Sequence, residues 1–328
     1  MSMNPHRLSC AFKLACGIVV LAFALIPCRL NAQQPGQLAL STFPADTHQV
    51  SFTDLGQLRT SPDYPQLRDR LLGSQLRDLE QFLRPAGDDP EADTDAVMLG
   101  WRGDVSNPSG FFGLATGQFH PGQVLDFFKR SKLPIATYSG VQLYSNGSSE
   151  PRSRFFFAFL DDTTAIFGRL DDLKTLLDVR AGSRPALDTN ASFVNWESEL
   201  DGSAPQWAIS TGRAAATEAT LWLSGGGNVK PPADLGALMT PIKAVLFSAD
   251  MVSSSDLAAH ISVVCDRPET ATALAQILTM WRNSHPAAGS GTPPQLANFL
   301  ASLNISAQGP RVELDGMGSA TLVQQLVH

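Results

Sequence analysis

Two pairs of adjacent carboxylates are the residues of this chain best suited by type and spacing to acid–base chemistry. Asp161 and Asp162 follow one apolar run, and Asp171 and Asp172 lie a few residues further on. Carboxylates that share a buried site can split their pKa values, so that one serves as acid and the other as base. The first pair, however, falls in the turn of a predicted hairpin and the second in the first turn of a predicted helix, where Asp has structural roles. We therefore interpret both pairs as structural.

A denser run of carboxylates is formed by Asp89, Glu91, Asp93 and Asp95, which alternate along the chain. Oxygen-rich loops of this kind can bind calcium. The run lacks the glycine of an EF-hand loop, and the twelfth position counted from Asp89 is Gly100, where such a loop supplies a bidentate glutamate. We interpret the run as a solvated loop and retain its four acids as candidate calcium ligands.

Sequence motifs of the common catalytic sites are absent. The chain has no GxxxxGK[ST], GxGxxG, HExxH, GxSxG or CxxC motif. The histidines beyond residue 32 are scattered without the spacing of metal ligands: His48, His120, His260, His285 and His328. The sequence thus identifies no catalytic residue and no cofactor.

Residues 1–32 predict a secretory signal peptide. A basic start with Arg7 and Lys13 precedes an uncharged apolar run, Leu14–Ile26, which is shorter than the ~20 residues of a membrane-spanning helix. Ala32 is the predicted last residue of the leader. We therefore expect an exported protein, periplasmic or extracellular, without stable membrane insertion after leader removal.

Removal of the leader makes the chain more acidic and leaves a single cysteine. Three of the 24 Lys and Arg residues are lost with it, so 21 remain against 31 Asp and Glu, a net charge near −10. This charge disfavours binding to nucleic acid and to anionic lipid surfaces. Cys28 would suit a lipid anchor, but Pro27 stands where such a site requires a small residue. Cys265 alone remains, so no internal disulfide is expected, and its alternating apolar strand predicts a buried, inert thiol.

The elements that must position these residues are organised around a hairpin followed by a helix. An apolar run, Phe155–Leu160, meets a polar turn and a second apolar run, Thr164–Phe167, which predicts a hairpin. The next leucines have helical spacing and precede Gly182, which can end the helix: Leu170, Leu173 and Leu177.

Consecutive phenylalanines make a further prediction about this hairpin. Phe155, Phe156 and Phe157 cannot all face one side of a strand, so both faces of that strand must be covered. Phe111 and Phe112 form a similar cluster. Core packing, or an apolar ligand or partner on one face, would provide the cover.

The same order of elements occurs twice. AVLFSADMV at 244–252 aligns with AVMLGWRGD at 96–104 at an offset of 148 residues, and Leu322 and Leu326 match the leucines of the first helix at an offset of 149. We predict a duplication of residues 96–182 in 244–327. Convergence of two strand–turn–strand–helix arrangements is the alternative.

The predicted fold class is α+β, with antiparallel sheets covered by helices on one face in two related halves. The predicted divisions are a signal peptide (1–32), a tether (33–42), a first half (43–223), a Gly- and Pro-rich linker (224–234) and a second half (235–328).

Four segments between residues 43 and 212 carry a resemblance: FPADTHQVSF, YSGVQLY, AFLDDTTAIFGRLDDLKTLLD and PALDTNASF. Together they resemble a group of exported bacterial proteins of unknown function. The resemblance implies bacterial export and an α+β fold, and it implies no activity, cofactor or catalytic residue.

These observations favour a non-enzymatic exported protein of the bacterial envelope that binds a protein partner or an apolar ligand. The alternative is a hydrolase with an unrecognised carboxylate site. A pocket with converging polar groups would favour the hydrolase, and a broad apolar sheet face would favour binding.

Overall fold

The computed structural model describes most of the chain beyond residue 34. The predicted leader and the predicted linker lie outside the described residues. The residues described are 35–62, 64–65, 77, 80–81, 83–87, 89–102, 111–145, 154–200, 202–223, 240–253, 256–284, 298–299 and 301–319.

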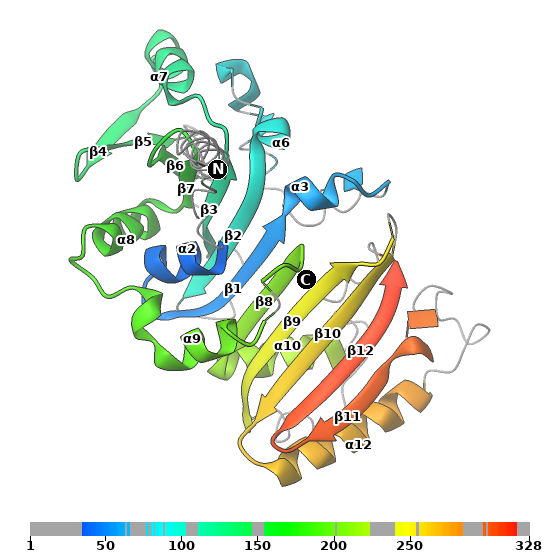
Figure 1. The fold of residues 1–328 in the computed structure, drawn as a ribbon. Coiled ribbons are helices and arrows are strands. Elements are labelled where there is room, and N and C mark those ends of the chain that lie inside the picture. Colours follow the sequence, from blue (N-terminus) through cyan, green and yellow to red (C-terminus); the bar gives the residue numbers. More distant parts are fainter. Residues whose placement is uncertain are drawn as a thin grey trace, which may run out of the picture. The chain divides into compact units, whose positions relative to one another are not determined.

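Twelve antiparallel strands form one continuous sheet, which confirms the α+β class (Figure 1). The order across the sheet is β11-β12-β10-β9-β8-β1-β2-β3-β7-β6-β5-β4. The strands are β1 (Thr47–Asp54), β2 (Thr94–Arg102), β3 (Phe111–Gly117), β4 (Ile135–Tyr138), β5 (Val141–Ser145), β6 (Phe156–Phe159), β7 (Thr164–Gly168), β8 (Gln206–Thr211), β9 (Ile242–Met251), β10 (Asp256–Cys265), β11 (Asn304–Gln308) and β12 (Arg311–Ser319).

Helices pack on both sides of this sheet (Figure 1). On one side lie α2 (Pro35–Thr42), α8 (Leu170–Arg180), the short η3 (Leu187–Thr189) and α9 (Ala191–Glu197). On the other side lie α3 (Leu55–Leu58), η2 (Arg84–Ala86), α6 (Pro90–Asp93), α7 (Pro121–Arg130), α10 (Gly212–Leu223) and α12 (Pro268–Ser284).

Helix α8 shows how the local sequence determines where a helix begins and ends. Asp171 and Asp172 lie in its first turn and Arg180 in its last, where their charges suit the helix dipole. Leu173 is fully buried against the sheet, and Gly182 follows the helix with φ +71°, a left-handed conformation that favours glycine. The predicted hairpin, helix and terminating glycine are all confirmed.

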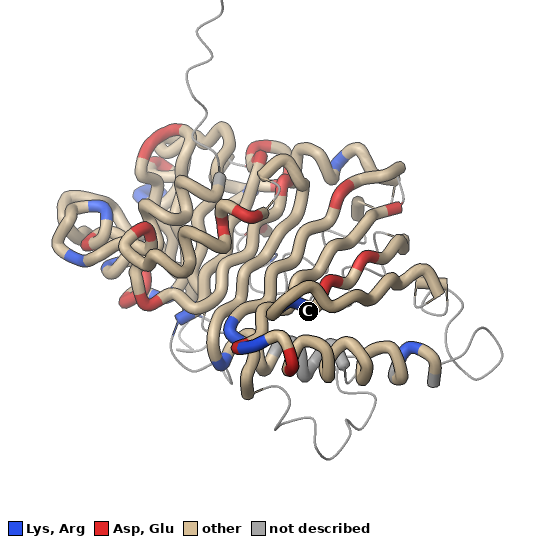
Figure 2. The backbone as a smooth tube through the Cα atoms, turned by 60° about the horizontal axis from the view of Figure 1, so that its bottom comes forward, with Lys and Arg blue, Asp and Glu red and all other residues tan. Residues whose placement is uncertain are grey.

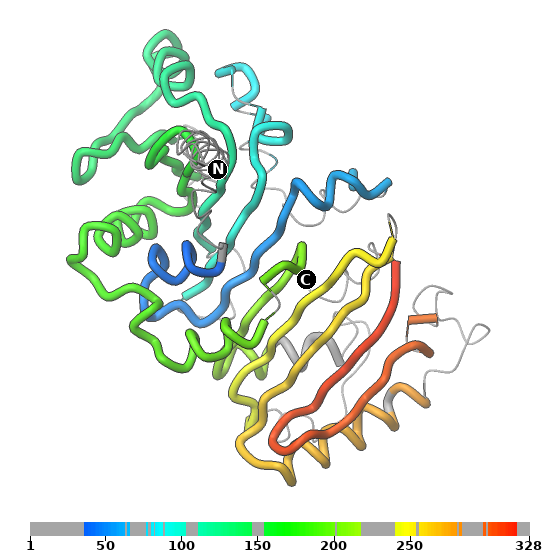
Figure 3. The backbone as a smooth tube through the Cα atoms, viewed as in Figure 1, coloured from blue at the N-terminus to red at the C-terminus, as the bar shows by residue number. Residues whose placement is uncertain are grey.

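Strand order is the same in both directions from the central β1–β8 pair (Figure 3). Outward from β1 the order is β1-β2-β3-β7-β6, and outward from β8 it is β8-β9-β10-β12-β11. Strands β4 and β5 extend the first half only, within the part of the chain that is described. The division between the halves therefore falls before β8, which the sequence had assigned to the first half.

The hydrogen-bond registers of the two halves also coincide. In the first half, Leu114 on β3 lies opposite Met98 on β2 and Ile166 on β7. The residues at the equivalent positions, 148, 148 and 147 places later, are Ser262, Leu246 and Glu313. Ser262 on β10 likewise lies opposite Leu246 on β9 and Glu313 on β12.

The two central strands, β1 and β8, are paired symmetrically. Val50 lies opposite Ile209 and Phe52 lies opposite Trp207, on either side of the facing residues Ser51 and Ala208. A local two-fold axis that passes between Ser51 and Ala208 would exchange the two halves. This topology supports the predicted duplication, which remains a prediction as an evolutionary event.

Both faces of the sheet are covered in the first half, which corrects the expectation of helices on one face only. Phe156 packs towards the side of α2 and α8, whereas Phe155 and Phe157 belong to the cluster on the side of α3 and α7. The alternation predicted for these phenylalanines is confirmed. Both faces are covered because α7, which follows β3, and α8, which follows β7, pack on opposite faces of the sheet.

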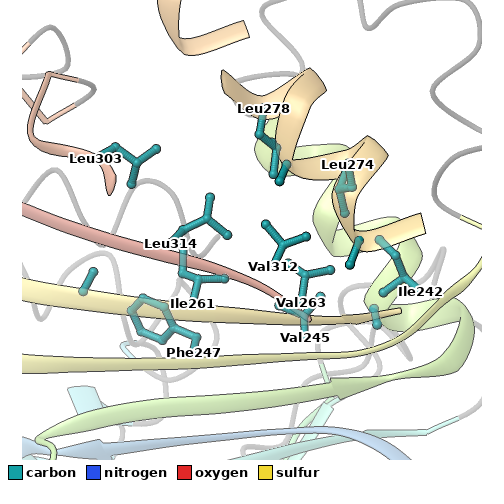
Figure 4. Packing of buried hydrophobic residues seen from close by; sticks show 14 of the residues in the cluster. Ile242, Val245, Phe247, Ile261, Val263, Leu274, Leu278, Leu303, Val312 and Leu314 are labelled. Atoms are coloured by element: carbon teal, nitrogen blue, oxygen red, sulfur yellow. The ribbon is translucent and has the colours of Figure 1, made fainter. Parts of the chain in front are cut away.

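In the second half, the apolar core lies between the sheet and helices α10 and α12. Figure 4 shows Leu274 and Leu278 of α12 facing Val245, Val263 and Val312 on three neighbouring strands. Branched side chains in register fill this layer densely.

The expected tether is wrong in part. Residues 35–42 form helix α2, because Ala39 and Leu40 are buried against the first-half core at 2% and 3% exposure. The segment YSGVQLY belongs to a hairpin, since Ser139 and Gly140 both have positive φ and reverse the chain between β4 and β5.

Among the helices of the described residues, none is long and apolar enough to cross a membrane.

Candidate functional site

An apolar pocket lies in the first half, between the sheet and the segment that contains α3, η2 and α6. Its volume is about 640 Å³, which includes open solvent at its mouth. Glu80, at 8% exposure, is the one charged side chain among its described lining residues. The lining residues are Leu55, Glu80, Leu83, Pro90, Thr94, Val97, Ala115, Phe119, Phe157, Phe159, Ala165, Ile166 and Phe167.

The floor of the pocket is a row of side chains across four strands. Val97 on β2 lies opposite Ala115 on β3, which lies opposite Ala165 on β7, which in turn lies opposite Phe159 on β6. Residues in register on neighbouring strands present their side chains to the same face. The two alanines in the middle of the row leave the space that the pocket occupies.

Aromatic rings form one wall. Phe157 and Phe167 occupy the next row on the same face, opposite each other on β6 and β7. The Phe167 ring lies over Gly113 so closely that a Cβ atom there would be 2.2 Å from its Cζ. Glycine at this position lets the ring lie flat on β3 and leaves the floor uncovered. Phe119, whose ring centroid is 5.8 Å from that of Phe159, contributes on the side of α7.

The cover of the pocket is fixed by arginines. The Arg59 guanidinium, after α3, donates to the backbone carbonyls of Glu91 and Thr94. Arg84 pairs with Glu91 at 2.6 Å and with Asp89 at 3.3 Å. These contacts join α3, η2 and α6 at the edge of the sheet, and so position Leu55, Leu83 and Pro90 over the floor.

The candidate calcium ligands are part of this cover. Asp89 and Glu91 contact Arg84, the Asp93 carboxylate accepts the backbone N–H of Asp89 at 2.8 Å, and Asp95 is exposed on β2. Within the described residues, no three His, Cys, Asp or Glu side chains are grouped to hold a metal ion. The local role of this loop is to anchor α6.

The equivalent row in the second half has larger side chains at two of its four positions, and the exposed Ala307 in place of Phe159 at its end. Val245, Val263 and Val312 stand where the first half has Val97, Ala115 and Ala165, and all three are at most 4% exposed. Leu274 of α12 faces them (Figure 4). In the first half, Phe128 of α7 instead packs beside the row, on Tyr144 and Phe157. The pocket thus lies where the first half has alanine in place of valine at two positions and where α7 packs beside the row.

A polar cluster occupies the opposite face of the second half. The His260 Nδ1 lies 2.7 Å from a carboxylate oxygen of Asp315, and its Nε2 lies 3.4 Å from one of Glu313. The Ser262 hydroxyl donates to Glu313 at 3.0 Å, and Arg311 pairs with Glu199 near α9 at 2.6 Å. In the first half, the positions of His260, Ser262 and Glu313 are occupied by buried apolar residues: Phe112, Leu114 and Ile166.

This cluster does not have the arrangement of a hydrolase site. Both nitrogens of His260 face carboxylates, and Ser262 donates its proton towards Glu313, so the contacts do not pair a nucleophile with an imidazole base. Sequence reasoning missed the cluster because His260 and its partners are 53 and 55 residues apart and meet only through the β10–β12 register.

The two carboxylate pairs are not shared acid–base sites. The Asp161 carboxylate accepts hydrogen bonds from the N–H and hydroxyl of Thr163, both at 2.8 Å. Burial alone would raise the pKa of Asp161, but these hydrogen bonds outweigh it and hold the pKa below its ordinary value. Asp172 accepts two hydrogen bonds from the Arg102 guanidinium, whereas the Asp171 side chain is 93% exposed. Asp161 therefore lies in the predicted turn and Asp172 in the predicted first helical turn, and their contacts support the structural interpretation.

Cys265 is a core residue, as the alternation of its strand predicted. It is 2% exposed and lies in one cluster with Ala259, Ile261 and Val263. Burial, together with the nearby charge of Asp266, raises the pKa of the Cys265 thiol to about 11. A protonated thiol in this setting is unreactive.

Lys and Arg form no continuous track in the part of the chain that the structure describes. Among the described residues, Lys and Arg occur singly or in short groups and do not follow one strand or groove (Figure 2). This distribution does not resemble the stripe of a protein that binds nucleic acid.

A scan against protein-family models finds no match, and a search of curated proteins finds none either. A search of solved structures finds "Structure of crystal form I of TP0453", with a TM-score of 0.53 and 12% sequence identity. The alignment covers 88% of this chain and 96% of that one. The likeness is one of fold alone. Because the alignment covers 88% of this chain, the likeness includes both halves of the sheet.

Proposed function

We propose that this chain is a non-enzymatic, exported binding protein of the bacterial envelope, and that it holds an apolar ligand in the first-half pocket. The observation that carries the proposal is the row Val97–Ala115–Ala165, which is open, while the same row in the second half is filled by valines. Empty apolar space costs packing energy, so a fold that can fill this layer in one half and leaves it open in the other suggests a use for the space.

The polar groups of the structure support binding over hydrolysis. The pocket brings together aromatic and aliphatic side chains with Glu80 and Thr94, and apolar lining of this kind is typical of sites for apolar ligands. Glu80 is the one ionisable side chain among the described lining residues of the pocket. The other cluster of acid–base groups lies on the sheet face of the second half, and its contacts do not form a nucleophile–base pair. These observations favour the binding proposal over the hydrolase alternative.

Export rests on the predicted leader. We expect the protein isolated from its native source to begin at Gln33, with or without cyclisation of that residue, because Ala32 ends the leader. Intact-mass measurement of the native protein checks this. An intact leader retained in the membrane fraction would contradict soluble export.

The binding proposal is tested by filling the pocket with the residues of the second half. The double variant Ala115→Val, Ala165→Val adds four methyl groups to the floor, and should weaken binding of apolar ligands by roughly a hundredfold, since each buried methyl or methylene contributes about 0.8 kcal/mol. Calorimetric titration with a panel of single alkyl chains and fused-ring hydrocarbons measures the loss.

The matched control is Ala136→Val, which adds the same groups at an exposed position of β4. We expect it to bind like the wild type. The filled variant should unfold at the same or a higher denaturant concentration, because Val263 and Val312 occupy these positions in the second half and filling a cavity stabilises. Equal binding by the filled variant, or no binding of any panel member by the wild type, would refute the proposal.

A further inference from the structure

The shape of the pocket restricts the class of ligand. Its floor crosses the strands at right angles, from Val97 on β2 to Phe159 on β6. Three inter-strand steps of about 4.8 Å separate the ends of this row by about 14 Å. Val97 and Phe159 stand at its two ends, and the open floor lies over Ala115 and Ala165 between them. Phe157 and Phe167 stand along one side of it in the adjacent row.

The rings along the floor are held in place by other rings. Phe157 stacks on Tyr144, with 5.2 Å between the ring centroids, and Phe167 stacks on Phe155 at 5.9 Å. Both phenylalanines are buried. A fused-ring hydrocarbon or a pair of chains side by side would need the Phe157 or Phe167 ring to move.

We propose that the ligand is a single unbranched alkyl or acyl chain that lies along this floor, across strands β2, β3, β7 and β6. This inference rests on the proposed function and names its ligand class. An extended chain matches an elongated floor because each methylene added to it gains apolar contact in turn. Its polar end would remain at the mouth, where Phe119 and Phe159 are only partly buried.

The test is a chain-length series of alkyl maltosides, titrated calorimetrically below their micelle concentrations into the full exported chain. The dissociation constant should fall about fourfold for each added methylene, and should level off once the chain is longer than the floor. The Ala115→Val, Ala165→Val variant should lose this dependence, and Ala136→Val should retain it. The single variant Ala165→Val blocks the middle of the floor. Its dissociation constant should therefore level off at a shorter alkyl chain than that of the wild type.

Pyrene separates this inference from the proposed function. If pyrene binds the wild type and not the filled variant, while alkyl maltosides do not bind, the pocket holds an apolar ligand and the chain class is wrong. A dissociation constant independent of chain length would also overturn the chain class. If neither ligand binds, the proposed function fails together with it.

Discussion

Replacement of Leu177 by alanine should lower the free energy of unfolding by about 2–5 kcal/mol. Leu177 lies on α8, is 4% exposed and belongs to the large cluster beneath α2, α8 and α9. Truncation leaves a cavity between α8 and the sheet that surrounding side chains can fill only in part. Urea denaturation followed by circular dichroism measures the change.

The control for this variant lies on the same helix. The Asp171 side chain is 93% exposed, so Asp171→Ala should change the stability by no more than about 0.5 kcal/mol. If Leu177→Ala lowered the free energy of unfolding by less than about 1 kcal/mol, the packing of Leu177 against the sheet would not be what anchors α8. Its predicted counterpart in the second half, Leu326, lies outside the described residues.

Local pattern was sufficient to predict the β6–β7 hairpin and helix α8. The Phe155–Leu160 run, the Asp161 turn and the helical leucines each determine structure within a few residues, so strand, turn and helix could be predicted from spacing alone. The facing of Phe156 away from its neighbours also followed, because alternation in a strand is fixed by the pleat.

The pocket could not be predicted in the same way. Ala115 and Ala165 are 50 residues apart, and each reads as an ordinary small residue in an apolar strand. They become neighbours only through the β3–β7 register, and the space above them depends on where α7 packs. A comparison of the two predicted copies at these positions, where the second has Val263 and Val312, is the signal that could have located it.

Whether the two halves share one sheet could not be predicted either. The Gly- and Pro-rich stretch at 224–234 suggested a linker because such composition commonly separates domains, and it lies outside the described residues. The hydrogen bonds of β8 to both β1 and β9 make the sheet continuous across its centre. Composition describes the local chain, whereas a shared sheet is a property of pairing between distant segments.

The continuous sheet leads to the second prediction: the two halves should unfold together. Phe247→Ala should lower the free energy of unfolding by about 3–5 kcal/mol, because Phe247 is 2% exposed in the second-half core (Figure 4). Met280→Ala, at a position 62% exposed on α12, is the matched control and should change it by no more than about 0.5 kcal/mol. Differential scanning calorimetry should show one transition, which moves to lower temperature in Phe247→Ala.

The same single transition should move in Leu177→Ala, although Leu177 and Phe247 lie in different halves. Strands β1 and β8 pair over five residues, with Phe52 stacked on Trp207 at 5.4 Å between ring centroids, so loss of either half exposes the core of the other. Two resolved transitions, each moved by only one of the substitutions, would contradict this coupling. In that case the β1–β8 contact would be an interface between two independently stable domains, and the first-half pocket could be studied in isolation.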